Sequence, residues 1–140
     1  MSNKSKGSNA ERELLKLFTE QGWRAARVAG SGMNENTFCD LIAGKMDRKG
    51  YAIEAKSSGK KRIYITKQQI EDFVLFSNMI GLKPVIAARF NREGWIFLHP
   101  EQLEDSGKYW AVGLDFAKEN GKRFGQFFEQ KIDEDMLSTS

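Results

Sequence analysis

The sequence has almost none of the residues on which many catalytic sites depend. Among its 140 residues there is one cysteine, Cys39, and one histidine, His99. A single cysteine cannot form an internal disulfide or a zinc knuckle, so Cys39 is predicted to be a small core residue in a strand. His99 precedes Pro100 at a predicted strand end. Any catalysis must therefore proceed without a Ser-His or Cys-His pair.

Long apolar segments are also missing. No apolar run approaches the roughly 18 residues that span a bilayer, and the first residues, MSNKSKGSNAER, lack the apolar centre of a signal peptide. These absences predict a cytoplasmic protein with no membrane partner. A length of 140 residues with 40% hydrophobic content predicts one globular domain over residues 1–140. Within it, we expect a basic flexible arm over residues 1–8 and a frayed tail over residues 132–140.

Positive charge is concentrated in the middle of the chain, although the net charge is only +3. Residues 45–67 hold eight Lys or Arg against two acids, whereas residues 101–140 hold five against nine. Such a concentration suits an anionic partner. A solvated set of lysine-rich loops is the simpler interpretation, and charge alone does not separate the two.

Hydrophobic periodicity predicts alternating helices and strands that form a mixed sheet flanked by helices, an α/β sandwich. Residues 101–140 are ambiguous. Asn120-Gly121 suggests a hairpin turn, whereas apolar residues from Leu114 to Phe128 recur at three- and four-residue steps and favour a carboxy-terminal helix. The predicted helices before this region are 9–21 and 67–80, and the predicted strands are 23–30, 38–44, 50–56, 63–65, 84–90 and 94–100.

Charged residues interrupt the apolar strands of the segment CDLIAGKMDRKGYAIEAK, residues 39–56. Strand side chains alternate between faces, so Glu54 and Lys56 point the same way. If the hairpin is symmetric about Asp47, Asp40 lies directly across from Glu54. Two close carboxylates repel each other unless a cation lies between them, and Mg²⁺ accepts such oxygen ligands. A structural salt bridge to Lys56 is the alternative.

The amino-terminal helix adds a third acid. On a helical projection, Glu11 falls between Leu15 and Phe18 on the apolar side, which faces the sheet. Glu11 also lies three residues after Ser8, which fits a capping box in which the glutamate bonds back to the backbone. The helix alone supports either role.

The helix that Thr66 is predicted to cap has apolar residues on two sides. Ile70, Phe73, Val74, Phe76 and Ile80 define a core face, whereas Leu75 and Met79 fall on the opposite side. A second apolar side indicates a partner surface. The alternative is a helix that the monomer covers completely.

In their order along the chain, these motifs resemble those of the archaeal Holliday junction resolvase family, within the PD-(D/E)xK nuclease superfamily. The segments that carry the resemblance are KGSNAERELLKLF, RVAGSG, DLIAG, IEAK and GWIF, and they span roughly residues 6 to 98. The family's proline before the aspartate is replaced by Cys39. The resemblance implies a restriction-endonuclease-like core, and the final 40 residues match poorly.

The resemblance also implies roles for individual residues. Glu11, Asp40 and Glu54 would be catalytic acids that bind the metal, Lys56 the catalytic lysine and Ser31 a further active-site residue. Arg12 and Arg27 match basic positions that the family uses for DNA. Apart from the resemblance, we expect further basic residues to hold phosphates without reading bases: Lys4, Lys6, Lys60, Lys61 and Arg62. Leu75, Phe76 and Met79 would lie at the interface of a homodimer.

The function implied is an endonuclease that resolves four-way DNA junctions by paired nicks in opposed strands. Mg²⁺ would be the cofactor, with Mn²⁺ as a substitute and no organic cofactor. Another nuclease of the same superfamily, of restriction or repair type, and a non-catalytic DNA-binding module are the alternatives. The presence of Asp40, Glu54 and Lys56 argues against the loss of catalysis.

Overall fold

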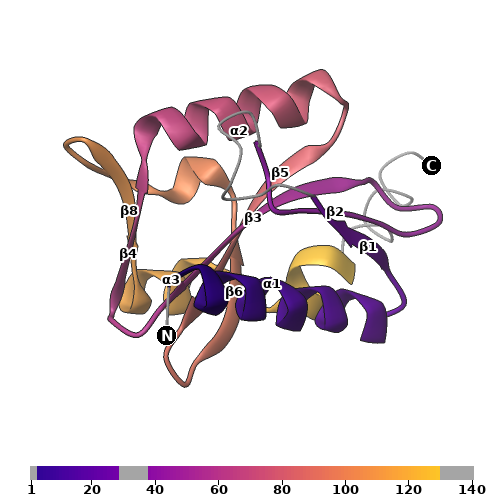
Figure 1. Cartoon of the computed structure of the whole chain (residues 1–140), viewed down its shortest axis with the longest axis horizontal. Coiled ribbons are helices and arrows are strands. Elements are labelled where there is room, and N and C mark those ends of the chain that lie inside the picture. The colour runs from indigo at the N-terminus through magenta and orange to yellow at the C-terminus, as the bar shows by residue number, and fades with distance from the viewer. Residues whose placement is uncertain (1–2, 29–37, 130–140) are drawn as a thin grey trace.

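A five-stranded mixed sheet runs through the centre of the molecule (Figure 1). The computed structural model describes residues 3–28 and 38–129. The strand order is β1-β2-β3-β5-β6, and only the β3–β5 pair is parallel. The strands are β1 (Arg24–Arg27), β2 (Leu41–Gly44), β3 (Tyr51–Ser58), β5 (Lys83–Phe90) and β6 (Gly94–Leu98).

Two long helices, α1 (Asn3–Glu20) and α2 (Lys67–Met79), lie on opposite sides of this sheet (Figure 1). On one side, Leu14 and Phe18 of α1 pack in a core cluster with Ile53 and Val85. On the other, Phe73 of α2 packs in a second cluster with strand residues of the opposite face. The mixed sheet flanked by helices is therefore the architecture that the sequence predicted. None of the helices among the described residues could span a membrane.

Helix α1 begins earlier than its periodicity predicted. Its first residue is Asn3, so most of the segment expected to be a flexible arm is helical. Ser8 consequently lies inside the helix, and the capping box that was one of two possible roles for Glu11 is excluded, because it requires the serine to precede the first helical turn. The side chain of Glu11 is free to take another role.

Helix α2 begins where the sequence predicted. Thr66 takes an extended backbone conformation, and its side-chain oxygen accepts a hydrogen bond from the backbone N–H of Gln69. This bond satisfies one of the N–H groups that the first turn of a helix leaves unpaired. At the other end, Gly81 has φ +75°, a left-handed conformation that terminates the helix at low cost.

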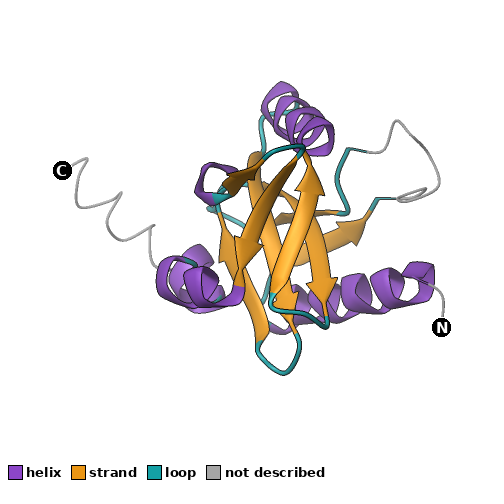
Figure 2. Cartoon of the chain, turned by 90° about the vertical axis from the view of Figure 1, so that its left-hand side faces the viewer, coloured by secondary structure: helices purple, strands orange, loops and turns teal. Residues whose placement is uncertain are grey.

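Two strands of the carboxy-terminal part, which the sequence did not predict, join the predicted strand over residues 63–65 in a second sheet. This antiparallel sheet has the order β4-β8-β7 and comprises β4 (Arg62–Thr66), β7 (Glu104–Ser106) and β8 (Tyr109–Gly113). The two sheets lie among the helices in Figure 2. A short turn of helix, η1 (Pro100–Gln102), connects β6 to β7.

The expected carboxy-terminal helix is broken into two short pieces, α3 (Leu114–Asn120) and η2 (Gly125–Glu129). Between them the chain turns extended, and Lys122 pairs with Phe97 at the edge of β6. Glycine at position 121 allows the chain to pass this close to β6, since a Cβ atom there would lie 2.4 Å from Ile96. The alternative of a hairpin turn at Asn120-Gly121 is not found either. The helical spacing of Phe124 and Phe128 reflects the packing of this segment against α1.

Candidate active site

The hairpin of β2 and β3 brings Asp40 and Glu54 together. Leu41 pairs with Ile53, which is the register that symmetry about Asp47 predicted. Asp47 itself has φ +64°, a conformation that aspartate tolerates in a tight turn. The carboxylate oxygen Oδ2 of Asp40 accepts a hydrogen bond of 2.8 Å from the backbone N–H of Ala55. Asp40 is therefore held beside the strand that carries Glu54.

Both carboxylates are nearly inaccessible to solvent: Asp40 is 9% exposed and Glu54 is 4% exposed. Among the described residues, two side chains contact the carboxylate of Glu54, and both contact the same oxygen, Oε2. The Lys56 ammonium nitrogen lies 3.7 Å from it, and the side-chain amide of Gln69 donates a hydrogen bond of 2.5 Å to it. Gln69 belongs to the first turn of α2 and was not among the residues that the sequence indicated. Only the packing of α2 on the sheet brings it here.

The electrostatics of this cluster favour a bound cation. Burial, reinforced by repulsion from Asp40, raises the pKa of Glu54 to about 8. Burial also raises the pKa of Glu11, with a further contribution from Asp40, and raises the pKa of the neighbouring Cys39 thiol to about 12. All three groups therefore resist the charged form, because burial removes the water that would stabilise the charge and the neighbouring carboxylates repel it.

Glu11 faces the sheet, as the helical projection predicted, and its side chain is 14% exposed. It forms an ion pair with Arg27 of β1, whose Nη2 lies 3.0 Å from Oε1 of Glu11. Two residues with separate predicted roles, metal binding and DNA binding, therefore contact each other. Glu11 interacts electrostatically with Asp40 and Lys56, which places it beside the same cluster.

The donor set fits a hard divalent cation that is completed by other ligands. Within residues 3–28 and 38–129, no three His, Cys, Asp or Glu side chains converge into a ready-made metal site. Mg²⁺ is usually held by one or two carboxylates together with water and substrate phosphates. Asp40 and Glu54 supply two such carboxylates, and the raised pKa of Glu54 is the mark of a buried acid that a cation would stabilise.

The predicted DNA-binding residues lie on several elements. Arg12, Lys60 and Lys61 are exposed, whereas Arg62 forms an ion pair with Glu104 of β7. Lys4 and Lys6 lie in the first turns of α1, but their side chains are outside the described part of the structure. Ser31 lies outside the described residues altogether.

The structure shows the second apolar side of α2, but Ile80 does not face the core as predicted. Leu75 is 60% exposed and Met79 is 76% exposed, whereas Phe76 is half-buried and stacks on Phe38. Ile80, predicted to face the core, is 46% exposed because the helix ends at Met79 and the chain turns away. The exposed apolar surface at this end of α2 is therefore larger than the sequence predicted.

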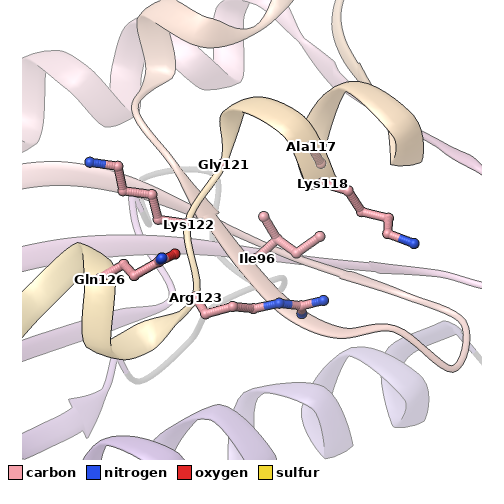
Figure 3. Close-up of a pocket in the computed structure, with 7 residues that line it drawn as sticks. All are labelled: Ile96, Ala117, Lys118, Gly121, Lys122, Arg123 and Gln126. Carbon is pink, nitrogen blue, oxygen red and sulfur yellow. The ribbon is translucent and has the colours of Figure 1, made fainter.

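A cavity of about 120 Å³ lies elsewhere, between β6, α3 and η2. Its lining includes Lys118, Lys122 and Arg123 but no carboxylate. Figure 3 shows Lys118 and Lys122 pointing in opposite directions, so the cations do not converge on one ligand. Lys118 pairs with Glu93, and Arg123 donates to the backbone carbonyls of Glu93 and Trp95. Lys118 and Arg123 therefore serve to hold this segment against the end of the β5–β6 hairpin. The cavity has no carboxylate that could bind a metal.

A mixed sheet between helices, with Asp40 beside one strand and Glu54 and Lys56 on the next, defines a restriction-endonuclease-like nuclease of the PD-(D/E)xK class. The sequence profile described as archaeal Holliday junction resolvase (Hjc) matches residues 2–132. The chain therefore belongs to the archaeal Holliday junction resolvase family.

Individual relatives agree with this assignment. The chain is 38% identical over 126 residues to the crossover junction endodeoxyribonuclease Hjc of Methanocaldococcus jannaschii, with 84% of this chain and 88% of the relative covered. It is 32% identical to the Hjc of Archaeoglobus fulgidus, with 92% and 99% covered. The structure of an A. fulgidus Hjc, a Holliday junction resolvase, superposes with a TM-score of 0.75 at 28% identity, covering 83% of this chain and 93% of that one.

Proposed function

We propose that this protein is a structure-selective endonuclease that resolves four-way DNA junctions by paired nicks in opposed strands. The cluster of Asp40, Glu54 and Lys56 supports this proposal most directly, because it joins two buried carboxylates and one ammonium on and beside the central strand β3. The relatives named crossover junction endodeoxyribonuclease and Holliday junction resolvase support the substrate.

Phosphodiester hydrolysis requires an activated water and stabilisation of the charge that develops on the phosphate. A divalent cation held by Asp40 and Glu54 would supply Lewis acidity at this position. We propose Mg²⁺ as that cation, with Mn²⁺ as a substitute, because the donors are hard oxygens. Lys56 would orient the water or stabilise the developing charge. Glu11 would complete the ligand set, and Ser31 would be a further active-site residue.

Release of the Glu11–Arg27 ion pair would accompany DNA binding in this proposal. Arg27 would exchange the Glu11 carboxylate for a phosphate, which frees Glu11 to face the metal. The other phosphate contacts would come from the remaining basic residues that the sequence indicated: Lys4, Lys6, Arg12, Lys60, Lys61 and Arg62. Such contacts position a duplex without reading its bases, which suits recognition of junction shape.

Two nicks in opposed strands require two active sites, so we propose a homodimer. The exposed apolar surface of α2 supports an interface that includes Leu75, Phe76 and Met79. The spacing of the two active sites in that dimer would then select four-way junctions over linear duplex.

The deciding experiment compares a four-way junction with linear duplexes of the same sequence, each incubated with the full chain and Mg²⁺. The proposal predicts symmetric nicks in opposed strands of the junction and little cleavage of the duplexes. Equal cleavage of both substrates would favour a restriction or repair nuclease of the same superfamily. Junction binding without cleavage, in Mg²⁺ and also when Mn²⁺ replaces it, would favour a non-catalytic DNA-binding module.

A further inference from the structure

The first turn of α2 reaches the candidate active site through a single side chain. The side-chain amide of Gln69 donates to Oε2 of Glu54 at 2.5 Å, and Gln69 is half-buried. Lys56 contacts the same oxygen from 3.7 Å. Because both of these partners engage Oε2, the other carboxylate oxygen, Oε1, is the one that the described side chains leave for a cation.

The position of Gln69 is fixed by its own surroundings. Its backbone N–H donates to the hydroxyl of Thr66, which caps the helix. The next residue, Ile70, is 6% exposed, and Phe73 one turn later is fully buried against the sheet. A capped first turn packed on the core gives the amide little freedom, which is the condition for holding a ligand in one orientation.

The chemistry of an amide suits this position. A neutral donor hydrogen-bonds a carboxylate without cancelling its charge, so the carboxylate can still attract a cation. Side chains that hydrogen-bond to a metal-binding carboxylate orient it, and their loss typically weakens metal binding by about 10- to 100-fold. A buried carboxylate that loses such a partner is free to rotate towards its remaining cation, Lys56.

We propose that Gln69 is a positioning residue, which holds Glu54 by Oε2 so that Oε1 is presented to a divalent cation. This proposal rests on the proposed metal-dependent nuclease function. It assigns to α2 a role in the active site in addition to covering the sheet.

The neighbouring residue provides a matched control. Gln68 is the same residue type in the same turn, but it is exposed, and its amide donates to Asp72 on its own helix at 2.9 Å. Gln68→Met and Gln69→Met therefore make the same chemical change in the same helical turn. They differ in whether the lost amide contacts Glu54.

The experiment measures Mn²⁺ binding to the full chain without DNA, by calorimetry or electron paramagnetic resonance, for the wild type and both variants. Gln69→Met should weaken Mn²⁺ binding by about 10- to 100-fold, and Gln68→Met should leave it within about twofold. In junction cleavage, Gln69→Met should raise the metal concentration needed for half-maximal rate, while the rate at saturating metal largely recovers. A purely structural role would lower the melting temperature and leave Mn²⁺ affinity unchanged.

Unchanged Mn²⁺ affinity in folded Gln69→Met would overturn the proposal. If that variant does not fold, Gln69→Asn replaces it, because asparagine keeps the amide but is one methylene too short to hold the same bond. The wild type separates this failure from a failure of the proposed function. A wild type that neither binds Mn²⁺ nor cuts junctions contradicts the nuclease assignment, whereas an active wild type with unaffected Gln69 variants contradicts the role of Gln69 alone.

Discussion

The ammonium nitrogen of Lys56 lies 3.7 Å from Oε2 of Glu54. The side chain of Lys56 is 33% exposed, whereas that of Glu54 is 5% exposed. Lys56 therefore extends from a buried carboxylate to the surface. A cation in this position can contact a substrate phosphate while it remains beside the carboxylate. A purely structural salt bridge would use the same contact, so the two roles must be separated by measurement.

The substitution Lys56→Ala separates a catalytic role of Lys56 from a structural one. If Lys56 acts on the phosphate or the water, single-turnover cleavage should fall by about 10²- to 10³-fold, as it does when other transition-state charge donors are removed. Junction binding should persist. Thermal unfolding is measured on the same samples. A loss of stability with cleavage close to the wild-type rate would identify Lys56 as a structural partner of Glu54.

Asp40→Asn and Glu54→Gln should each remove cleavage, by more than about 100-fold, because each change takes a charged ligand from the cation. The fold should survive, and junction binding should persist or tighten as repulsion from phosphate decreases. The readouts are junction cleavage in Mg²⁺ and binding in its absence. Asp115→Asn, which alters an exposed carboxylate on α3, is the control. Mg²⁺-dependent nicking at a near wild-type rate in either active-site variant would contradict the site assignment.

The stability of the metal-free protein should depend on pH through Glu54. Its pKa is raised from 4.5 to about 8, mainly by burial, so the folded state retains a proton that the unfolded state has released. Stability should therefore fall as the pH rises from about 5 to about 8. Thermal unfolding across this range checks the slope, which Glu54→Gln should reduce but not abolish, since the pKa of Glu11 is raised too.

The proton that folded Glu54 retains should also make metal binding depend on pH. A cation must displace it from Glu54, so Mn²⁺ affinity should rise with pH across the same range. An affinity that stays constant from about pH 6 to pH 8 would contradict the placement of the metal at Glu54.

Junction binding should weaken steeply with salt, because each phosphate contact releases counterions. The slope of log affinity against log salt is about −0.9 per contact on duplex arms. Substituting both Lys60 and Lys61 with alanine should make the slope shallower by up to about 1.8. Lys118→Ala, which breaks an ion pair with Glu93 in the turn between β5 and β6, should leave the slope unchanged. A wild-type affinity that is insensitive to salt would mean that other contacts dominate binding.

Combining Leu75→Glu with Met79→Glu should dissociate the proposed dimer. Buried, unpaired charges cost several kcal/mol each, and symmetry doubles their number at the interface. The monomer should still fold, since both residues then face water. Light scattering should report a monomer, and coordinated nicking of the two strands should be lost.

The control for that variant is Met46→Glu, which changes an apolar residue that is 88% exposed in the β2–β3 turn. It should remain dimeric and should nick both strands. If the α2 double variant also remains dimeric with coordinated nicking, the interface lies on another surface.

The sequence was sufficient for the individual strands of the central sheet and for its β2–β3 hairpin, because their signals are local. Period-two alternation assigned Ile53 and Glu54 to opposite faces, and the turn centred on Asp47 set the register that places Asp40 beside Glu54. Helix-capping chemistry likewise located the start of α2 at Thr66. Those features made the acidic cluster predictable from residues that are close in the chain.

The carboxy-terminal region was not predictable in the same way. The edge of β6 pairs with Lys122, and that pairing interrupts a segment whose apolar spacing favours one continuous helix. Tertiary hydrogen bonds and the packing of Phe124 and Phe128 on α1 outweigh the modest free energy of local helix propensity. The short strands β7 and β8 have equally weak local signals, because β8 is defined by its pairing with β4, and β7 by its pairing with β8.

The sequence by itself therefore determined the α/β class, the hairpin register and the residue types of the candidate site. The tertiary structure alone brought Gln69 to Glu54 and Arg27 to Glu11, across separations of 15 and 16 residues. Local patterns determine which face a side chain occupies, because backbone geometry repeats over a few residues. The neighbour that a side chain meets depends on how whole elements pack, and packing is decided by the burial of their combined apolar surface.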